Sequence, residues 1–224
     1  DLLNDEMGAV GREMTPPVWS PALEEAKLGD RLLWVNYGDG CNVYLLTVTE
    51  EIKNVKPKRG VKGHLAAKQT LSSYIRYLRW RGIISEEPPR RPRPEVPSAV
   101  ALKRDSKGGL ALYGSKCKKC GTPQYPAQRV CVRCNAKGEF EDYCFADKEG
   151  KLATFGHDSQ AASVDPPATV SVVDFVGGGR MICDMTDREP DEVKVGMPVE
   201  MTFRKLRSVE GIHDYWWKSQ PIRS

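Results

Sequence analysis

Two near-continuous apolar runs, Arg31–Val35 and Val43–Val48, stand out in the first 50 positions, with a turn holding two glycines between them. Such runs are typical of strands buried on both faces. Before them, Ser20 as a cap and Gly29 as a stop predict a short helix over residues 21–27. Two buried strands and one helix cannot cover each other, so this part of the chain must pack against something larger.

Helical spacing of apolar residues returns between His64 and Trp80. Leu71, Ile75 and Leu78 fall on one stripe, and Gly82 follows as a stop. The pattern predicts one helix over residues 64–80.

A proline-rich run then divides the chain. Five prolines fall within residues 88–97, which forbids a helix and favours an extended, semi-rigid spacer. We therefore expect four parts, with no internal repeat: an N-terminal segment, a linker, a zinc ribbon and a barrel with a C-terminal tail. Their bounds are 1–84, 85–98, 99–140 and 141–224.

Short strand patterns separated by turn residues fill the C-terminal part. They fall at 152–158, 169–175, 180–185, 197–203 and 213–217. The run Gly177–Gly179 joins the second and third strands as a hairpin. Five short strands in this order predict a small barrel of the OB type, and a β-sandwich fragment is the alternative.

Composition narrows the class of protein further. The 224 residues are 40% hydrophobic and 29% charged, as in a globular protein that carries a linker. No run approaches the roughly 18 apolar residues of a membrane span, and the start lacks the features of a signal peptide. We expect a soluble, cytoplasmic protein without a membrane partner. The chain does not begin with Met, so we also expect it to start inside a longer polypeptide or to be processed.

Charge is unevenly distributed. Residues 53–94 hold 12 basic side chains and two acidic ones, although the whole chain is only +4. The remainder of the chain is therefore acidic overall, and the basic segment is a candidate for binding anions.

Two Cys-x-x-Cys pairs carry the clearest chemistry, and their ligands are Cys117, Cys120, Cys131 and Cys134. Four thiolates at this spacing can close a tetrahedral zinc site, and Gly121 and Asn135 are residue types that tolerate the left-handed turn after each pair. No coordination position remains open, so we predict structural Zn²⁺. A catalytic zinc and a redox pair are the weaker alternatives. Cys144 and Cys183 lie in apolar surroundings and are interpreted as buried small side chains.

A zinc ribbon beside an OB barrel also raises the possibility of nucleic-acid binding. Residues 115–138 contain six basic side chains and no acidic one, which favours it. The barrel region 151–224 carries 9 basic and 11 acidic side chains, whereas a barrel that binds single strands needs a positive groove. Nucleic acid is therefore the second interpretation.

Residues 96–206 resemble the acyl-CoA-associated zinc-ribbon/OB family, whose members accompany thiolases and related condensing enzymes. The resemblance is carried by the two cysteine pairs, by Tyr125-Pro126, by Gly150–Thr154 and by Gly196–Val199. It implies a rubredoxin-like ribbon, a CoA thioester as substrate and a catalytic partner. It also implies that the zinc-ribbon/OB domain docks the complex and helps to hold CoA.

Residues 1–84 are similar to the carboxyl end of a hydroxymethylglutaryl-CoA synthase or ketosynthase III. The matching stretches are Leu28–Gly40, Val48–Ile52 and Tyr74–Gly82. In that thiolase superfamily the glycine loop between the last two strands supplies a backbone N–H to the oxyanion hole. The resemblance places this donor on Asp39, with Gly38 and Gly40 allowing a thioester to approach; an ordinary glycine turn is the alternative.

The basic segment offers partners for the phosphates of CoA. The candidates are Lys58, Arg59, Arg76, Arg79 and Arg81. A solvated charged surface is the competing interpretation.

No block of this chain matches the nucleophilic Cys, general-base Glu or His of the synthases. We therefore expect an α+β chain that is not catalytic by itself: the C-terminal fragment of a thiolase-like α/β fold, followed by the ribbon and a five-stranded barrel. It would complete an acyltransferase complex of higher oligomeric order. The catalytic subunit, or a missing N-terminal part of the same polypeptide, would supply the rest.

Overall fold

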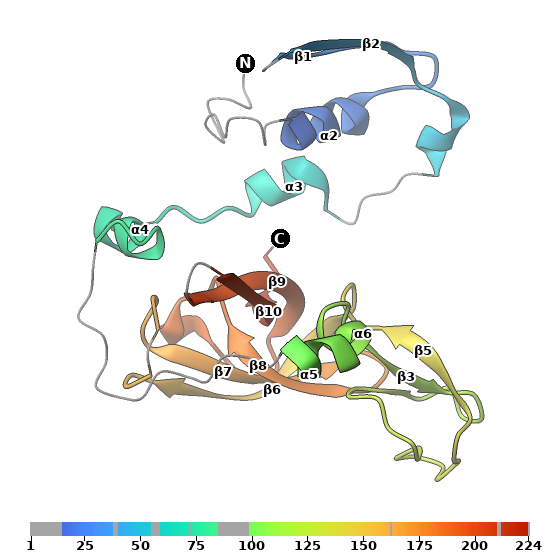
Figure 1. The fold of residues 1–224 in the computed structure, drawn as a ribbon, viewed down its shortest axis with the longest axis vertical. Coiled ribbons are helices and arrows are strands. Elements are labelled where there is room, and N and C mark those ends of the chain that lie inside the picture. The colour runs from blue at the N-terminus through green and yellow to red at the C-terminus, as the bar shows by residue number, and fades with distance from the viewer. Residues whose placement is uncertain are drawn as a thin grey trace. The chain divides into compact units, whose positions relative to one another are not determined.

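The computed structural model describes residues 15–37, 40–54, 59–71, 73–84, 99–161, 163–209 and 212–223. The chain forms two compact units, one of residues 1–70 with 223–224 and one of residues 71–222 (Figure 1). The proline-rich linker predicted at 85–98 lies outside the described residues. Within the described part of the chain, no helix has the length and apolar character needed to cross a bilayer.

Helices and one hairpin make up the first unit. They are α2 (Thr15–Glu25), β1 (Arg31–Tyr37), β2 (Cys41–Thr47), a 3-10 turn (Glu50–Lys53) and α3 (Gly60–Ala66). The helix predicted over 21–27 instead starts six residues earlier, with Pro21 in its interior. Pro16 and Pro17 explain the early start, because the fixed φ of proline suits the first helical turn. Gly29, at φ +90°, ends the segment as predicted.

Strands β1 and β2 pair antiparallel in one hairpin, with Leu33 opposite Leu45 and Val35 opposite Val43. The expectation that both faces are buried is wrong for this chain alone. These four side chains share one face and are 53–68% exposed. Leu32, Trp34 and Leu46, on the other face, are half-buried. The described residues of this unit therefore leave one apolar face of the hairpin uncovered.

The single helix predicted over 64–80 is also wrong, because the structure divides this segment into α3 and α4 (Tyr74–Trp80). Ser73 begins the second helix, since its hydroxyl accepts the N–H of Arg76 at 3.5 Å. A serine that caps a helix is unfavourable in the interior of one, and this local competition breaks the predicted stripe. Gly82, at φ +66°, follows α4.

An arginine–aspartate cluster ties α4 to the rest of the second unit. Asp165 accepts Arg76 Nη2 at 2.8 Å and Arg188 Nη1 at 2.6 Å. The Arg188 side chain is only 2% exposed, and it also donates to Thr169 Oγ1 and to the carbonyls of Asp165 and Pro167. One carboxylate thus neutralises a buried arginine and anchors a helix 89 residues away in sequence.

Two short helices and a three-stranded sheet come next in the second unit. They are α5 (Ala99–Arg104), α6 (Ser106–Gly109), β3 (Tyr113–Cys117), β4 (Pro123–Gln124) and β5 (Phe140–Cys144). The sheet is antiparallel, with β3 between β4 and β5. The indole N–H of Trp217 donates to Leu110 O at 3.0 Å, which joins the end of α6 to the barrel.

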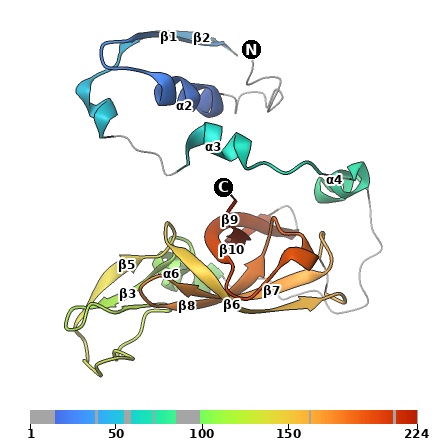
Figure 2. The same ribbon diagram turned by 180° about the vertical axis from the view of Figure 1, so that it is seen from behind.

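Five strands close the barrel in the order β10-β8-β7-β6-β9. Their bounds are β6 (Glu149–Asp158), β7 (Ala168–Phe175), β8 (Arg180–Met185), β9 (Pro198–Val209) and β10 (Ile212–Pro221). A short parallel contact of Ser219 in β10 with Met185 in β8 completes the ring. Figure 2 shows these strands from behind. The five-stranded barrel is confirmed. The sandwich alternative is wrong, because β9 pairs with β6, β10 pairs with β8, and β9 and β10 pair with each other, which closes the sheet.

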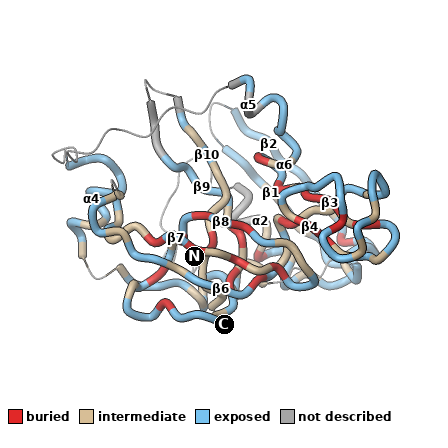
Figure 3. Tube along the Cα trace, turned by 90° about the horizontal axis from the view of Figure 1, so that it is seen from below, coloured by how far each residue is buried: buried red, intermediate tan, exposed pale blue. Residues whose placement is uncertain are grey.

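Alternation of buried and exposed residues places the core inside the barrel, as the buried stretches of β6, β7 and β8 show in Figure 3. The core residues are Leu112, Phe145, Leu152, Val173, Phe175, Met181, Cys183, Met185, Val193, Val199 and Met201. A polar contact crosses this interior, where Ser171 Oγ lies 2.8 Å from Ser219 Oγ and donates to Cys183 O at 2.8 Å. Buried hydroxyls are thus satisfied by each other and by the strand backbone.

The glycine run predicted as a hairpin turn joins β7 to β8, and all three glycines have positive φ. Close approach is a second requirement there. A Cβ on Gly178 would lie 2.8 Å from Pro123 O, and one on Gly179 would lie 2.8 Å from a ring carbon of Phe145. The turn therefore packs directly against the strand that precedes the second cysteine pair.

Candidate functional site

Two tight turns at one end of the ribbon present the four predicted ligands. In the first turn, Gly121 N donates to Cys117 O at 2.8 Å, and in the second, Asn135 N donates to Cys131 O at 3.0 Å. Gly121 has φ +70° and Asn135 has φ +56°. Both residues thus adopt the left-handed conformation that the sequence predicted for them.

The four thiol sulfurs converge, because all of them lie within 4.8 Å of one another. Cys117 Sγ is 3.6 Å from Cys134 Sγ, and Cys120 Sγ is 3.5 Å from Cys131 Sγ. A tetrahedron with Zn–S bonds of about 2.3 Å has edges of about 3.8 Å, so these separations suit a zinc ion. The cluster fits the predicted ligand set of a zinc ribbon.

The four thiols also shift one another's ionisation in opposite directions. The pKa of Cys120 is lowered to about 6, chiefly because the side chain and backbone of Thr122 hydrogen-bond to its sulfur. The pKa of Cys134 is raised to about 12: the N–H of Ala136 lowers it, but burial and the other three thiols outweigh that contact. Four adjacent thiolates repel one another unless a metal ion neutralises them.

Protein sulfurs would occupy all four positions of this metal. A bound Zn²⁺ would supply folding energy and hold the two turns together, and it would have no open position for water or substrate. The geometry therefore supports a structural role rather than a catalytic one.

Gln124 also contributes to this site, although the sequence analysis did not select it. Its side chain is buried, and Oε1 accepts the N–H of Val132, inside the second cysteine pair, at 2.7 Å. Its Nε2 atom is buried and has no hydrogen-bond partner in the described part of the chain. Gln124 thus connects β4 to the second turn through this hydrogen bond. Its position four residues after Cys120 was the available signal.

Of the loop predicted to complete an oxyanion hole, only Gly40 falls among the described residues. Gly40 is exposed, and a Cβ there would meet nothing within 4 Å. Gly38 and Asp39 lie outside the described residues, as does Lys58. The role of this loop stays a prediction.

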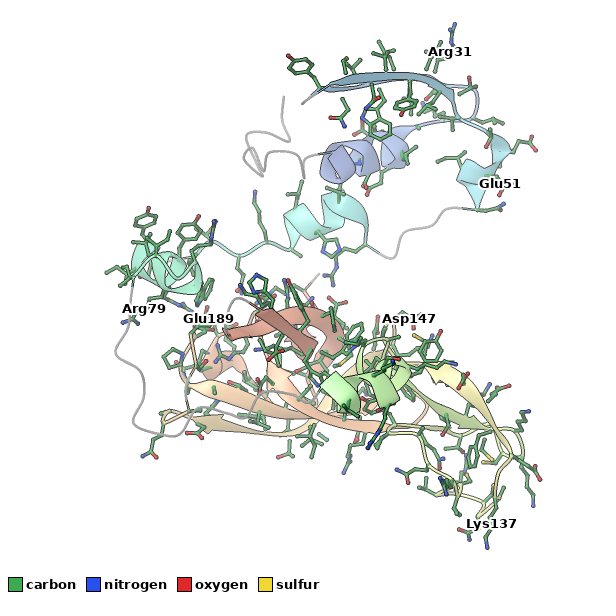
Figure 4. All side chains as sticks on the ribbon, in the orientation of Figure 1. Arg31, Glu51, Arg79, Lys137, Asp147 and Glu189 are labelled. Atoms are coloured by element: carbon green, nitrogen blue, oxygen red, sulfur yellow. The ribbon has the colours of Figure 1, made fainter. Side chains whose placement is uncertain are left out.

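The predicted CoA-binding arginines have different surroundings. Arg59 is half-buried in the first unit, whereas Arg76, Arg79 and Arg81 lie at α4 in the second. Arg76 pairs with Asp165 and lies over the ring of Trp80 at 5.3 Å, which gives it a structural role. Arg81 Nη1 donates to Tyr77 Oη at 3.1 Å. Arg79 is exposed and points away from the helix in Figure 4.

Of the three cysteines outside the metal cluster, Cys41 is exposed, and the other two serve packing. Cys183 is 7% exposed in the barrel core, and burial raises the pKa of its thiol. Cys144 is half-buried, with its sulfur 3.8 Å from Ala111 O. Neither is placed as a nucleophile.

The sequence analysis also did not predict an aromatic surface on β9 and β10. Phe203, Tyr215 and Trp217 lie together on one face of these two strands. Their spacing at alternate positions of β10 was the signal, because residues i and i+2 of a strand share a face.

Comparison with known families matches the ribbon and most of the barrel in the second unit. A family described as the rubredoxin-like zinc ribbon domain of ChsH2 matches residues 110–141, and one described as the C-terminal OB-fold domain of ChsH2 matches residues 145–204. The zinc ribbon and the OB-type barrel are thereby confirmed as domain types.

Curated relatives include two described as DUF35 domain-containing scaffold proteins. The one from Methanocaldococcus jannaschii is 30% identical over 126 residues, or 54% of this chain and 89% of that protein. The one from Methanothermobacter thermautotrophicus is 31% identical over 115 residues, or 49% of this chain and 86% of that protein. A probable enoyl-CoA hydratase alpha subunit from Thermomonospora curvata is 24% identical, over 70% of this chain and 55% of that protein.

Among solved structures, the Ltp2-ChsH2(DUF35) aldolase aligns with 58% of this chain and 98% of that chain. The TM-score is 0.41 and the sequence identity is 19%.

Proposed function

Because the chain belongs to the DUF35 family, we propose that it is a noncatalytic component of an acyl-CoA condensing enzyme, which it completes and holds together. The observation that carries the proposal is its identity of 30–31% to proteins described as scaffolds, over 83–89% of their length. The metal site agrees with this role, since four protein thiols leave no position for a substrate.

Coenzyme A chemistry is the second part of the proposal. The relative described as a probable enoyl-CoA hydratase alpha subunit is similar over 70% of this chain, a wider span than the scaffold proteins cover. Together with the resemblance of residues 1–84 to condensing enzymes, it supports a CoA thioester as the substrate of the complex.

The N-terminal segment would complete a thiolase-like fold. Its hairpin leaves Leu33, Val35 and Leu45 more than half exposed, which is costly unless another chain or another part of the polypeptide covers them. The loop at Gly38, Asp39 and Gly40 would then reach the active site and donate the Asp39 N–H to the thioester oxygen.

The reaction would be a Claisen-type condensation or its thiolytic reverse. The catalytic partner, or an N-terminal part of the same polypeptide, would supply the cysteine that carries the acyl group. This chain would add the oxyanion donor and, through Arg79, Arg81, Lys58 and Arg59, partners for the CoA phosphates.

Nucleic-acid binding remains the second candidate because the ribbon is strongly basic. Exposed Lys118, Lys119, Arg129, Arg133 and Lys137 surround the metal site, and no acidic residue lies between positions 115 and 138. Binding of this kind would weaken steeply as salt rises.

Reconstitution with a thiolase-fold subunit tests the proposal. We expect condensation or thiolysis of acyl-CoA only when both chains are present. Gly38→Val should lower kcat about 10²–10³-fold with little change in KM, because it displaces one oxyanion donor. Asp39→Ala is the matched control and should keep most activity, since the donor is main chain. Full activity of the partner alone, or of the Gly38→Val complex, would contradict the proposal.

A further inference from the structure

The outward face of the barrel over β6, β7 and β8 has an apolar centre. These three strands are neighbours in the sheet, and the even-numbered residues of β7 and β8 point away from the core (Figure 2). Val172 lies opposite Ile182 of β8 and opposite Thr154 of β6. Ile182 is 68% exposed, and Val170, two positions from Val172 on the same face, is 42% exposed. The described residues therefore leave an apolar row on this outer face uncovered.

Two ion pairs border the apolar row, one towards each end of β8. At one end Arg180 lies opposite Asp174 and donates two hydrogen bonds to its carboxylate, at 2.5 and 2.7 Å. At the other end Asp184 Oδ2 lies 3.7 Å from Lys218 Nζ. Arg180, Ile182 and Asp184 are successive outward residues of β8. A cation, an apolar side chain and an anion therefore follow one another along a single strand.

Gly156 of β6 allows another surface to approach this face closely. It lies opposite Val170, and a Cβ there would meet no heavy atom within 4 Å in the described part of the chain. Gly156 is also not among the glycines with positive φ, so the backbone does not require glycine at this position. A glycine in the interior of a strand that neither packing nor backbone requires is typical of a site of close approach.

The order of charges along β8 indicates what covers the face. Suppose that a second copy of the chain packs face to face, with a two-fold axis that crosses the strands; each strand then meets its counterpart in reverse order. Ile182 would meet Ile182 of the second copy, and Arg180 would meet the second copy's Asp184, twice by symmetry. Both charged residues keep their partners within the chain, so charges of alternating sign line up and none is buried unpaired.

Other occupants fit this face less well. The two ion pairs cancel, which gives no attraction for a nucleic acid or for a strongly charged protein. The basic segments 53–94 and 115–138 are poor alternatives for a two-fold contact, because each would bring an excess of like charge together.

We propose that the outer face of β6, β7 and β8 is a two-fold interface between two copies of this chain, with Val172 and Ile182 at its centre and Arg180–Asp184 pairs at its border. The inference goes beyond the proposed function, because the contact forms without a catalytic partner. Three short strands make a small contact, so we expect a dissociation constant of about 10 μM. Such a dimer would join two copies of the chain, each with its own partner, into an assembly of higher order.

Sedimentation velocity of the full chain over about 1–100 μM tests the interface. We expect the wild type to pass from monomer to dimer across this range. Ile182→Glu should weaken the dimer at least about tenfold, because two carboxylates would face each other at the apolar centre. Val195→Glu, at a valine that is 64% exposed in the turn before β9, is the matched control and should dimerise as wild type does.

Arg180→Ala tests the order of the charges. It should weaken the dimer about fivefold, since it removes both Arg180–Asp184 pairs, and the remaining association should depend less on NaCl concentration. Arg204→Ala is the control, because it removes a comparably exposed ion pair, with Asp187, that is not part of the proposed contact. Circular dichroism of each variant verifies folding.

A wild-type chain that stays monomeric at every concentration would overturn the inference, as would equal dimerisation of Ile182→Glu and wild type. Leu33→Glu with Leu45→Glu should leave the dimer intact, and loss of the dimer in that variant would place the contact on the β1–β2 hairpin instead. A monomeric chain that needs Ile182 to bind a condensing subunit would assign the face to that subunit. Dimerisation without any activity on reconstitution would refute only the proposed function.

Discussion

The side-chain carbonyl of Gln124 accepts the N–H of Val132 at 2.7 Å. This contact joins the strand after the first cysteine pair to the turn that holds the second pair. Gln124 is 3% exposed, so water cannot easily replace it. The metal site thus depends on a residue that contributes no ligand.

Replacing Gln124 by Leu should weaken zinc binding about tenfold or more, because supporting residues of this kind orient the ligands. Competition with a chromophoric chelator measures the affinity. Gln128→Leu, at an exposed glutamine of the same ribbon, is the control and should bind zinc as wild type does. Unchanged zinc affinity in Gln124→Leu would show that the second turn keeps its conformation without the hydrogen bond to Gln124.

Metal content tests the ligand set itself. Elemental analysis should give about one zinc per chain, by the four-thiolate rule. Cys117→Ser should lose the metal and destabilise the ribbon, whereas Cys144→Ser, outside the cluster, should retain it. Less than half a zinc in fresh protein, or an iron–sulfur absorption spectrum, would refute a zinc ribbon.

Asp165 should be important for stability because it neutralises the buried Arg188. Removing one partner of a buried ion pair costs about 3–5 kcal/mol, and we expect Asp165→Ala to lower the free energy of unfolding by about 3 kcal/mol. Arg76→Ala should cost about 1 kcal/mol or less, since that pair is more exposed. Urea unfolding measures both, with exposed Asp191→Ala as the control. An equal decrease in the free energy of unfolding for all three variants would show that Asp165 has no special role in stability.

The exposed apolar face of the β1–β2 hairpin should be required for the chain to assemble with a partner. Leu33→Glu with Leu45→Glu introduces charge on that face and should prevent assembly with a partner, while leaving the barrel folded. Leu28→Glu, at a residue 47% exposed outside the strands, is the control. Size-exclusion chromatography with light scattering reports the result. If the double variant assembled as wild type does, this face would not be an interface.

Local patterns in the sequence predicted much of the second unit. The metal turns need only Cys-x-x-Cys spacing and a following Gly121 or Asn135, and the β7–β8 hairpin needs only its glycines. Alternation of apolar residues was sufficient to place five barrel strands, because strand periodicity depends on neighbours two positions apart.

Local patterns did not predict contacts between residues that lie far apart in the sequence. The bond between Arg76 and Asp165 spans 89 residues, and no local pattern marks either member. The break between α3 and α4 depends on whether Ser73 caps a helix or lies within one, a choice that small energies decide. The grouping of Phe203, Tyr215 and Trp217 on one surface depends on the register of β9 against β10, including the irregularity at Asp214 and Tyr215, which only the structure supplies.

Native mass spectrometry of the complex that a tagged full chain retrieves from its own cells tests the central claim most directly. The account predicts an assembly of higher order that contains this chain, about one zinc per copy by the four-thiolate rule, and a thiolase-fold subunit active on acyl-CoA. The chain alone, or the chain with nucleic acid and no condensing enzyme, would contradict it.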